Sequence, residues 1–157
     1  MPKSLATWFT PSLQTISRSA GRSAVAAAAY RACVKLIDQT TGLIHDYTRK
    51  RGHVETLLVG ADDISELWNK AEAAETRKNS TVARELMLPL PDQWTDNERR
   101  ACVLDIAQHL RDTYGVAAAG SIHAANRHDR NGHCHLMFTT RVVDDDGNFG
   151  KKTRILD

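Results

Sequence analysis

Two strand-like segments near the end of the chain, residues 116–124 and 133–143, follow one another across a short polar connection. Parallel neighbours in a sheet need a crossover connection of about a dozen residues or more, usually a helix, whereas antiparallel neighbours need only a short loop. These two segments therefore predict an antiparallel pair, and they limit the chain to folds that contain such a sheet.

Helical patterns alternate with further strand patterns along the rest of the chain. The clearest helix begins at Thr95 and ends at Tyr114, because Thr95 and Glu98 form a capping-box pattern and Gly115 supplies a C-terminal cap. Two more helices are expected at residues 23–37 and 64–78. Strands are expected at residues 5–10, 43–48, 54–59 and 82–88, the last stopped by Pro89, and after the turn at residues 144–147.

Paired strands joined by short turns favour an α+β fold, with a central antiparallel sheet and its helices packed largely on one face. The chain of 157 residues has a typical size for one compact domain. Three cysteines without a CxxC pair argue against a disulfide framework and fit a reducing cytosol. The N-terminus lacks the apolar core of a signal peptide, and no apolar run approaches the ~20 residues that a membrane span requires. We therefore expect a soluble, cytoplasmic protein with no membrane segment.

The net charge of +2 is too small to argue for a nucleic-acid partner, but the basic residues are unevenly distributed. They form an early cluster at Arg18, Arg22, Arg31 and Lys35, and a late cluster at Arg127, Arg130, Arg141, Lys151, Lys152 and Arg154. Such clusters can follow a phosphate backbone, and they can equally be a solvated surface. Charge alone leaves both interpretations open.

Three histidines on the last two long strands could share a metal ion. His133 and His135 point to the same face of their strand, about 7 Å apart at their backbones, while Cys134 points to the other face. His123 on the preceding strand becomes a third ligand if the two strands are neighbours. Three neutral imidazoles that leave positions for a substrate are typical of a catalytic metal site, although packed or surface histidines would show the same pattern. His45, His53 and His109 have no evident partners and are expected at the surface.

Tyr30 lies on the alanine-rich helix among apolar neighbours. Its spacing by itself favours a core aromatic with its hydroxyl at the rim. The flanking cations Arg22, Arg31 and Lys35 allow a second interpretation, because a phenolate is a competent nucleophile toward phosphorus. Periodicity does not decide between the two.

Several long, ordered motifs resemble the MobA/MobL relaxases of mobilizable and conjugative plasmids. The first is the run from Ile16 to Arg31, which reads ISRSAGRSAVAAAAYR. Further matches are Asp46–Lys50, Leu67-Trp68-Asn69 with Glu72, Glu75, Arg77, Lys78 and Asn79, then Ala83-Arg84-Glu85 with Leu90-Pro91, and finally His123, His133–His135, Thr140–Val142 and Leu156-Asp157. The resemblance covers nearly the whole chain.

The resemblance implies an HUH relaxase fold and its chemistry. His123, His133 and His135 correspond to the family's ligands for a divalent metal ion, Mn²⁺ or Mg²⁺, and Tyr30 corresponds to its nucleophile. Glu85 is the candidate for a supporting acidic residue, although a capping or ion-pair role fits it equally well. Arg18, Arg22, Arg31, Lys35 and Arg141 are the candidates for DNA contacts.

The resemblance also implies the substrate and partners. The substrate would be single-stranded DNA at an origin of transfer, with a hairpin and a nick site, cut with formation of a 5′-phosphotyrosine adduct that can be rejoined. Relaxosome accessory proteins and a coupling protein would be partners in a bacterial cytoplasm. Family members usually continue with further helices, so residues 1–157 would form a relaxase domain truncated at its C-terminal end.

Three other functions share part of this pattern. A rolling-circle replication initiator uses the same chemistry, but it usually places its tyrosine after the histidines, whereas Tyr30 precedes His123 by more than ninety positions. A DNA-binding remnant could bind metal and hairpin DNA without cutting. A structural metal domain would need a fourth protein ligand, and the sequence indicates none.

Overall fold

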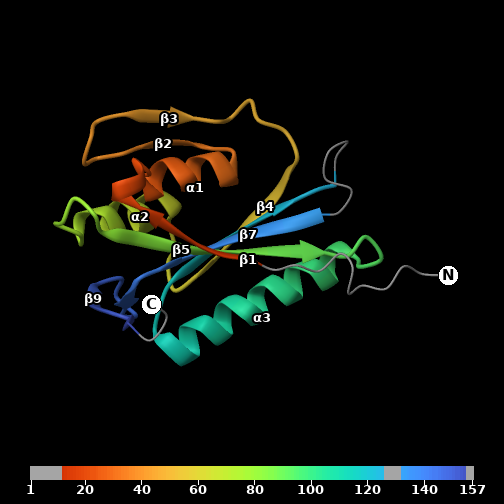
Figure 1. Ribbon diagram of the computed structural model, residues 1–157. Helices are drawn as coiled ribbons and strands as arrows, with labels where there is room; N and C mark the ends of the chain where they lie inside the picture. The colour runs from red at the N-terminus through yellow and green to blue at the C-terminus, as the bar shows by residue number, and fades with distance from the viewer. Residues whose placement is uncertain (1–11, 126–131, 155–157) are drawn as a thin grey trace.

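The computed structural model describes residues 12–125 and 132–154 (Figure 1). Its centre is an antiparallel five-stranded sheet with the strand order β1-β5-β7-β6-β4. These strands are β1 (Ser12–Ser17), β4 (His53–Val59), β5 (Thr81–Leu90), β6 (Ala118–His123) and β7 (Gly132–Thr139). The predicted α+β class, the antiparallel sheet and the pairing of its last two long strands are confirmed.

Helices cover both faces of the sheet (Figure 1). Helices α1 (Ala24–Ala32) and α2 (Ile64–Ala73) lie on one face, where Trp68 and Met137 belong to the buried core. Helix α3 (Asp96–Tyr114) lies on the other face, where Val103 packs with Cys134 and Leu136. Two of the three described helices thus share a face as expected, but the longest helix builds a second core on the opposite face.

Helix α1 is shorter than the sequence predicted. It begins after Ser23, whose side chain accepts a hydrogen bond from the backbone N–H of Ala26. It ends at Cys33, which adopts the left-handed conformation with φ 54°, and the backbone N–H of Val34 donates to the carbonyl of Ala29. The predicted helical residues 35–37 instead form β2 (Lys35–Ile37), which pairs with β3 (Ile44–Asp46) in a separate hairpin.

Long-range pairing explains the other differences. The strands predicted at 43–48 and 54–59 exist as β3 and β4, but they pair with β2 and β6 and not with each other. Helix α2 ends at Ala73 and not at residue 78, because the side chain of Arg18 binds the carbonyls of Glu72 and Glu75 at its end. Strand β1 was not predicted, and the strand expected at residues 5–10 lies outside the described residues.

Strand β5 continues through Pro89, which was expected to stop it. Pro89 faces His133 of β7, but the described part of β1 pairs with β5 only as far as Met87. On that side no described strand requires an N–H from Pro89, so the proline is tolerated. The segment predicted as one strand, residues 133–143, bends at Thr140 into β7 and β8 (Arg141–Val143), and β8 pairs with β9 (Phe149–Lys152). Helix α3 has the predicted start, capping box and Gly115 cap.

Candidate functional site: a histidine cluster beside the end of α1

Three histidines form a cluster on the α1 and α2 face of the sheet. His123 of β6 lies directly opposite His133 of β7, and His135 follows two residues later on the same face. Their ring centroids are 5.1 Å to 5.6 Å apart in all three pairs. Cys134, between the two β7 histidines, is fully buried in the core on the opposite face, as the alternation predicted. Burial also raises the pKa of its thiol.

Two of these rings use one nitrogen to contact a protein acceptor. His123 donates from Nε2 to the backbone carbonyl of Arg31 at 2.7 Å, because a carbonyl oxygen only accepts. His135 lies with Nδ1 3.3 Å from Oε1 of Glu85. Histidines that bind metals commonly donate their other ring N–H to a carbonyl or carboxylate, which fixes the tautomer and leaves the second nitrogen as a lone-pair donor. This leaves Nδ1 of His123 and Nε2 of His135 as lone-pair donors.

Arg31 and Glu85 connect the cluster to helix α1. The guanidinium of Arg31 forms an ion pair with both oxygens of the buried Glu85 carboxylate, through Nε and Nη2. Burial opposes ionisation of Glu85, but hydrogen bonds from His135 and Arg31 outweigh it and hold its pKa below the ordinary value. Glu85 is therefore a carboxylate at neutral pH. The ion-pair interpretation of Glu85 agrees with its contact to Arg31, while its supporting role in the site stays a prediction.

One ring of the cluster, that of His123, is held in its neutral form. Burial lowers the pKa of His123 to about 4, and the nearby charge of Lys50 adds to this effect, so the ring is neutral at physiological pH. Neutral imidazoles are the form that binds metals. The described residues nevertheless contain no group of three or more ligand side chains already arranged around one metal position. The residue types and hydrogen-bond partners fit a divalent ion, while closing the rings on one point requires side-chain rotation.

Tyr30 lies in the last turn of α1, immediately before Arg31. Its side chain is 46% exposed, so the interpretation as a core aromatic is wrong. The buried face of α1 is formed instead by Val25 and by small alanines such as Ala28 and Ala29. Arg31 contacts both His123 and Glu85, and so connects α1 to the histidine cluster. Tyr30 is its neighbour in the chain.

His53 is a neighbour of the cluster that the sequence analysis placed at the surface. It pairs with His123 across β4 and β6, and the ring centroids of the two are 5.7 Å apart. Its Nε2 lies 2.8 Å from Oγ1 of Thr56, which in turn lies 3.0 Å from Oγ of Ser121. Only the pairing of β4 with β6 brings His53 here, and no local sequence pattern predicts that pairing. His109 is exposed on α3, and His45 is only partly buried on β3.

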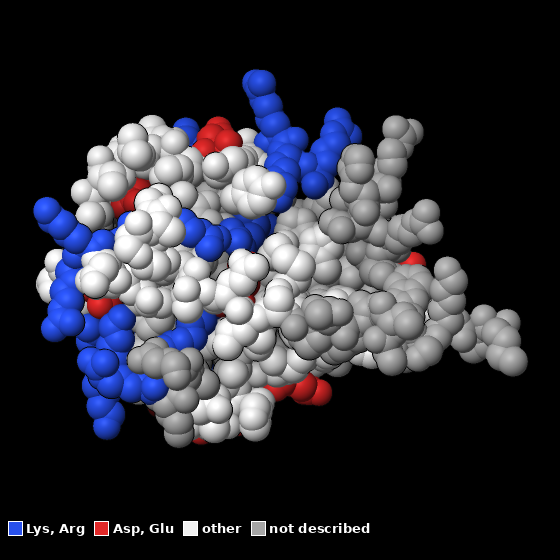
Figure 2. Space-filling model, viewed as in Figure 1, with Lys and Arg blue, Asp and Glu red and all other residues white. Residues whose placement is uncertain are grey.

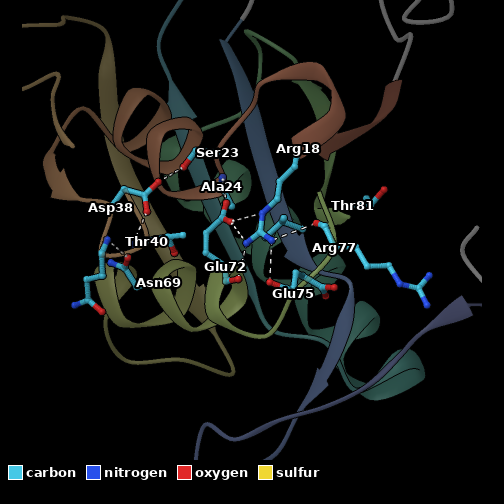
Figure 3. A network of polar contacts seen from close by, with 12 residues as sticks. Arg18, Ser23, Ala24, Asp38, Thr40, Asn69, Glu72, Glu75, Arg77 and Thr81 are labelled. Atoms are coloured by element: carbon cyan, nitrogen blue, oxygen red, sulfur yellow. Dashed lines mark hydrogen bonds and ion pairs between the residues drawn. The ribbon is translucent and has the colours of Figure 1, made fainter. Parts of the chain in front are cut away.

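The candidate DNA-contact residues differ in how many of their donors the protein already uses. Arg18 pairs with Glu72 and donates to the carbonyls of Glu72, Glu75 and Arg77, which holds the end of α2 against the start of α1 (Figure 3). Arg31 pairs with Glu85, and Arg141 pairs with Glu75. Among the described residues the guanidinium of Arg22 makes one hydrogen bond, to the carbonyl of Thr15, and Lys35 is exposed. Their contacts with DNA stay predictions, and Arg22 and Lys35 keep the most donor capacity for them.

A basic surface lies at the end of the molecule that carries β9. Figure 2 shows Lys and Arg side chains gathered on this side. A cavity of about 450 Å³ lies among its residues, and Glu75 is the one carboxylate among the described residues that line it. Its cationic lining residues are Arg77, Arg84, Arg141, Lys152 and Arg154. This excess of positive charge at one end fits an anionic partner better than the whole-chain charge indicates.

The site thus combines a histidine cluster on an antiparallel sheet with an exposed tyrosine on the helix whose Arg31 contacts that cluster. Residues 22–157 match the model of the MobA/MobL family, and the chain belongs to that family. It is 40% identical over 173 residues to the mobilization protein MobL of Acidithiobacillus ferridurans, covering 93% of this chain and 46% of that protein. It is 32% identical over 164 residues to the conjugal transfer protein TraA of Agrobacterium fabrum, covering 92% of this chain and 14% of that protein.

A solved structure has the same fold. That structure, described as the molecular basis of vancomycin resistance transfer in Staphylococcus aureus, has a TM-score of 0.80 and 28% sequence identity, over 91% of this chain and 75% of that one. The chain spans about half the length of the MobL relative and a smaller part of the TraA relative. None of the helices in the described part of the chain is long and apolar enough to cross a membrane.

Proposed function

We propose that this chain is the relaxase domain of a plasmid mobilization protein, which nicks one DNA strand at an origin of transfer and stays attached to it through Tyr30. The observation that carries the proposal is the position of Tyr30. Its ring is exposed at the end of α1, and the next residue, Arg31, contacts both His123 and Glu85. In this proposal, one strand of DNA contacts both the tyrosine and the histidine cluster.

The proposed reaction exchanges one phosphate ester for another. The oxygen of Tyr30 loses its proton and forms a bond to phosphorus, while the bond between phosphorus and the 3′ oxygen breaks. The 3′ oxygen leaves and takes up a proton, and the 5′ phosphate stays on Tyr30 as a phosphodiester. Because the bonds broken and formed are of the same kind, attack by a 3′ hydroxyl on the adduct rejoins the strand.

His123, His133 and His135 would hold a divalent metal ion, Mn²⁺ or Mg²⁺. Such an ion supplies Lewis-acid polarisation of the scissile phosphate and offsets charge in the transition state. The chain's own residues prepare the position: Arg31 and Glu85 orient His123 and His135 by accepting hydrogen bonds from their second nitrogens. In this proposal Glu85 acts through His135 and not on the DNA.

The basic surface supports the proposed substrate. Lys and Arg side chains near a phosphate backbone release counterions, so binding to DNA would weaken as salt rises. Arg22 and Lys35 would contact phosphates near α1, and the surface around β9 would bind the strand or its hairpin. Accessory proteins of a relaxosome and a coupling protein are the expected partners, in the cytoplasm of a bacterial cell.

Adduct formation tests the proposal directly. The protein is incubated with single-stranded oligonucleotides that tile the DNA upstream of its gene, with Mn²⁺ or with a chelator, and separated on a denaturing gel. We expect a shifted band that requires Mn²⁺ and is lost in Tyr30→Phe. Tyr114→Phe is the matched control, because Tyr114 belongs to α3 on the opposite face, and it should keep the band. An adduct that survives Tyr30→Phe would assign the attachment to another residue.

A further inference from the structure

The side chain of Tyr30 is held by the turn that follows β3. Tyr47 packs edge-on against its ring, with centroids 5.1 Å apart and planes at 86°. The ammonium of Lys50 lies 3.5 Å from the centroid of the same ring. A cation above an aromatic face at this distance is attracted by the ring electrons. Lys50 also donates a hydrogen bond to the backbone carbonyl of Tyr30 at 3.2 Å, so it contacts this residue twice.

Backbone contacts fix this turn against the end of α1. The N–H of Tyr47 donates to the carbonyl of Val34 at 3.2 Å, and the N–H of Lys50 donates to the carbonyl of Tyr47 at 3.0 Å. Asp46 accepts from both the N–H and the hydroxyl of Thr48, which stabilises the start of the turn. These contacts hold the turn in a position where Lys50 lies against Tyr30.

Lys50 differs from Arg31 in the partners of its charged group. Arg31, the residue after Tyr30, is paired with Glu85. In the described part of the chain, the side chain of Lys50 has no carboxylate partner. It contacts the ring and the carbonyl of Tyr30, and its charge also reaches the rings of His53 and His123. Because no described carboxylate competes for the ammonium of Lys50, this group can stay on the Tyr30 ring and orient it.

We propose that Lys50 is a positioning residue for Tyr30, which holds the phenol ring in one orientation for attack on the phosphate. This inference rests on the proposed function, because it assigns a role within the same reaction. Misplacing a reacting group by about 1 Å can cost on the order of a hundred-fold in rate. The contact therefore affects the reaction step, whereas affinity for DNA depends on the wider basic surface.

Three variants separate positioning from general electrostatics. Lys50→Met keeps the length of the side chain and removes the cation, and Lys50→Arg keeps a cation that can lie on the ring. Arg51→Gln removes the same charge one residue away, at an exposed side chain. We expect Lys50→Met to slow single-turnover adduct formation by roughly ten-fold or more. Its dissociation constant for DNA should change no more than that of Arg51→Gln, and Lys50→Arg should recover most of the rate. Equal rates in Lys50→Met and Arg51→Gln would overturn the proposal.

A second measurement needs no reaction. In protein with ¹³C-labelled tyrosine, the Tyr30 ring signals are identified by their loss in Tyr30→Phe. These signals should move in Lys50→Met and stay in place in Arg51→Gln, without DNA or metal. Unmoved signals in a folded Lys50→Met variant would reject the positioning role. If the wild-type protein forms no adduct, the proposed function fails, and the ring signals still decide whether Lys50 orients Tyr30.

Discussion

At the scale of single residues, the histidine cluster depends on acceptors outside it. The carbonyl of Arg31 and the carboxylate of Glu85 each contact one ring nitrogen, so each imidazole has a defined second nitrogen. The backbone of α1 thereby takes part in the site without contributing a ligand side chain. A change that moves the end of α1 would disturb His123 and Tyr30 together.

His133→Ala should weaken the binding of Mn²⁺. Removing one of three imidazoles leaves too few protein ligands for tight binding, so the affinity should fall by about ten-fold or more. Isothermal titration calorimetry measures the change, with His109→Ala on the exposed surface of α3 as the matched control. Unchanged Mn²⁺ affinity in His133→Ala would remove this residue from the metal site.

Arg18→Met should reduce stability much more than DNA binding. The substitution leaves the carboxylate of Glu72, whose side chain is only 4% exposed, without its cation. Breaking a buried ion pair costs about 3 kcal/mol or more. Urea denaturation measures the free energy of unfolding, and Arg22→Gln is the comparison, because the side chain of Arg22 makes a single hydrogen bond within the described part of the chain, to the carbonyl of Thr15. If Arg22→Gln proves the more destabilising of the two, the structural role assigned to Arg18 is wrong.

At the scale of helices and strands, local signals predicted what local interactions determine. The capping box of Thr95 and Glu98 fixes the start of α3, and alternation along β7 separates His133 and His135 from Cys134. The sequence predicted that the first helix would end at residue 37 and that His53 would lie at the surface, whereas α1 ends at Ala32 and His53 lies against His123. Cys33 ends the helix in a conformation that few non-glycine residues adopt, and His53 reaches the cluster only through pairing of distant strands. Neither is encoded in the spacing of nearby residues.

Gly120→Ala should loosen the packing of α3 against the sheet. A Cβ atom at this position would lie 2.7 Å from Cγ1 of the buried Val103, so the helix or the strand must shift. Overpacking of this kind costs about 1–3 kcal/mol. Gly150→Ala is the control, because the nearest atom to its new Cβ is 3.7 Å away. Thermal unfolding of the two variants measures the difference, and equal melting temperatures would contradict the close approach of α3.

At the scale of the whole molecule, one buried carboxylate is among the contacts that attach the β8–β9 hairpin to the rest of the fold. Glu75, after α2, accepts from Arg141 at 2.8 Å and lies 3.2 Å from Nζ of Lys152. Burial raises the pKa of Glu75, but the hydrogen bonds from these two cations outweigh it and hold the pKa below its ordinary value of 4.5. Glu75 therefore stabilises the folded protein in its charged form.

The contribution of Glu75 to stability should depend on pH in one direction. It is fully present well above 4.5, where the carboxylate is charged in both folded and unfolded chains, and it is lost as pH falls through the lower folded pKa. Urea denaturation of the wild type and of Glu75→Gln should give a difference in free energy of unfolding at pH 7 that shrinks below about pH 4.5. A difference that grows with acidity would mean that the sign of this interaction is wrong.

The two faces of β7 also bear on how this protein can change over time. Cys134 is sealed beneath α3, while the histidines on either side face α1. Natural variation at position 134 should then be limited by side-chain volume and hydrophobicity, because that side chain lies on the opposite face of the strand from the histidine cluster. In a saturation library at this position, the variants that keep activity should be those whose side chains fit the core. At position 133 or 135, they should be those whose side chains can replace the imidazole chemically. Neighbouring positions 133, 134 and 135 should therefore evolve under different selective constraints.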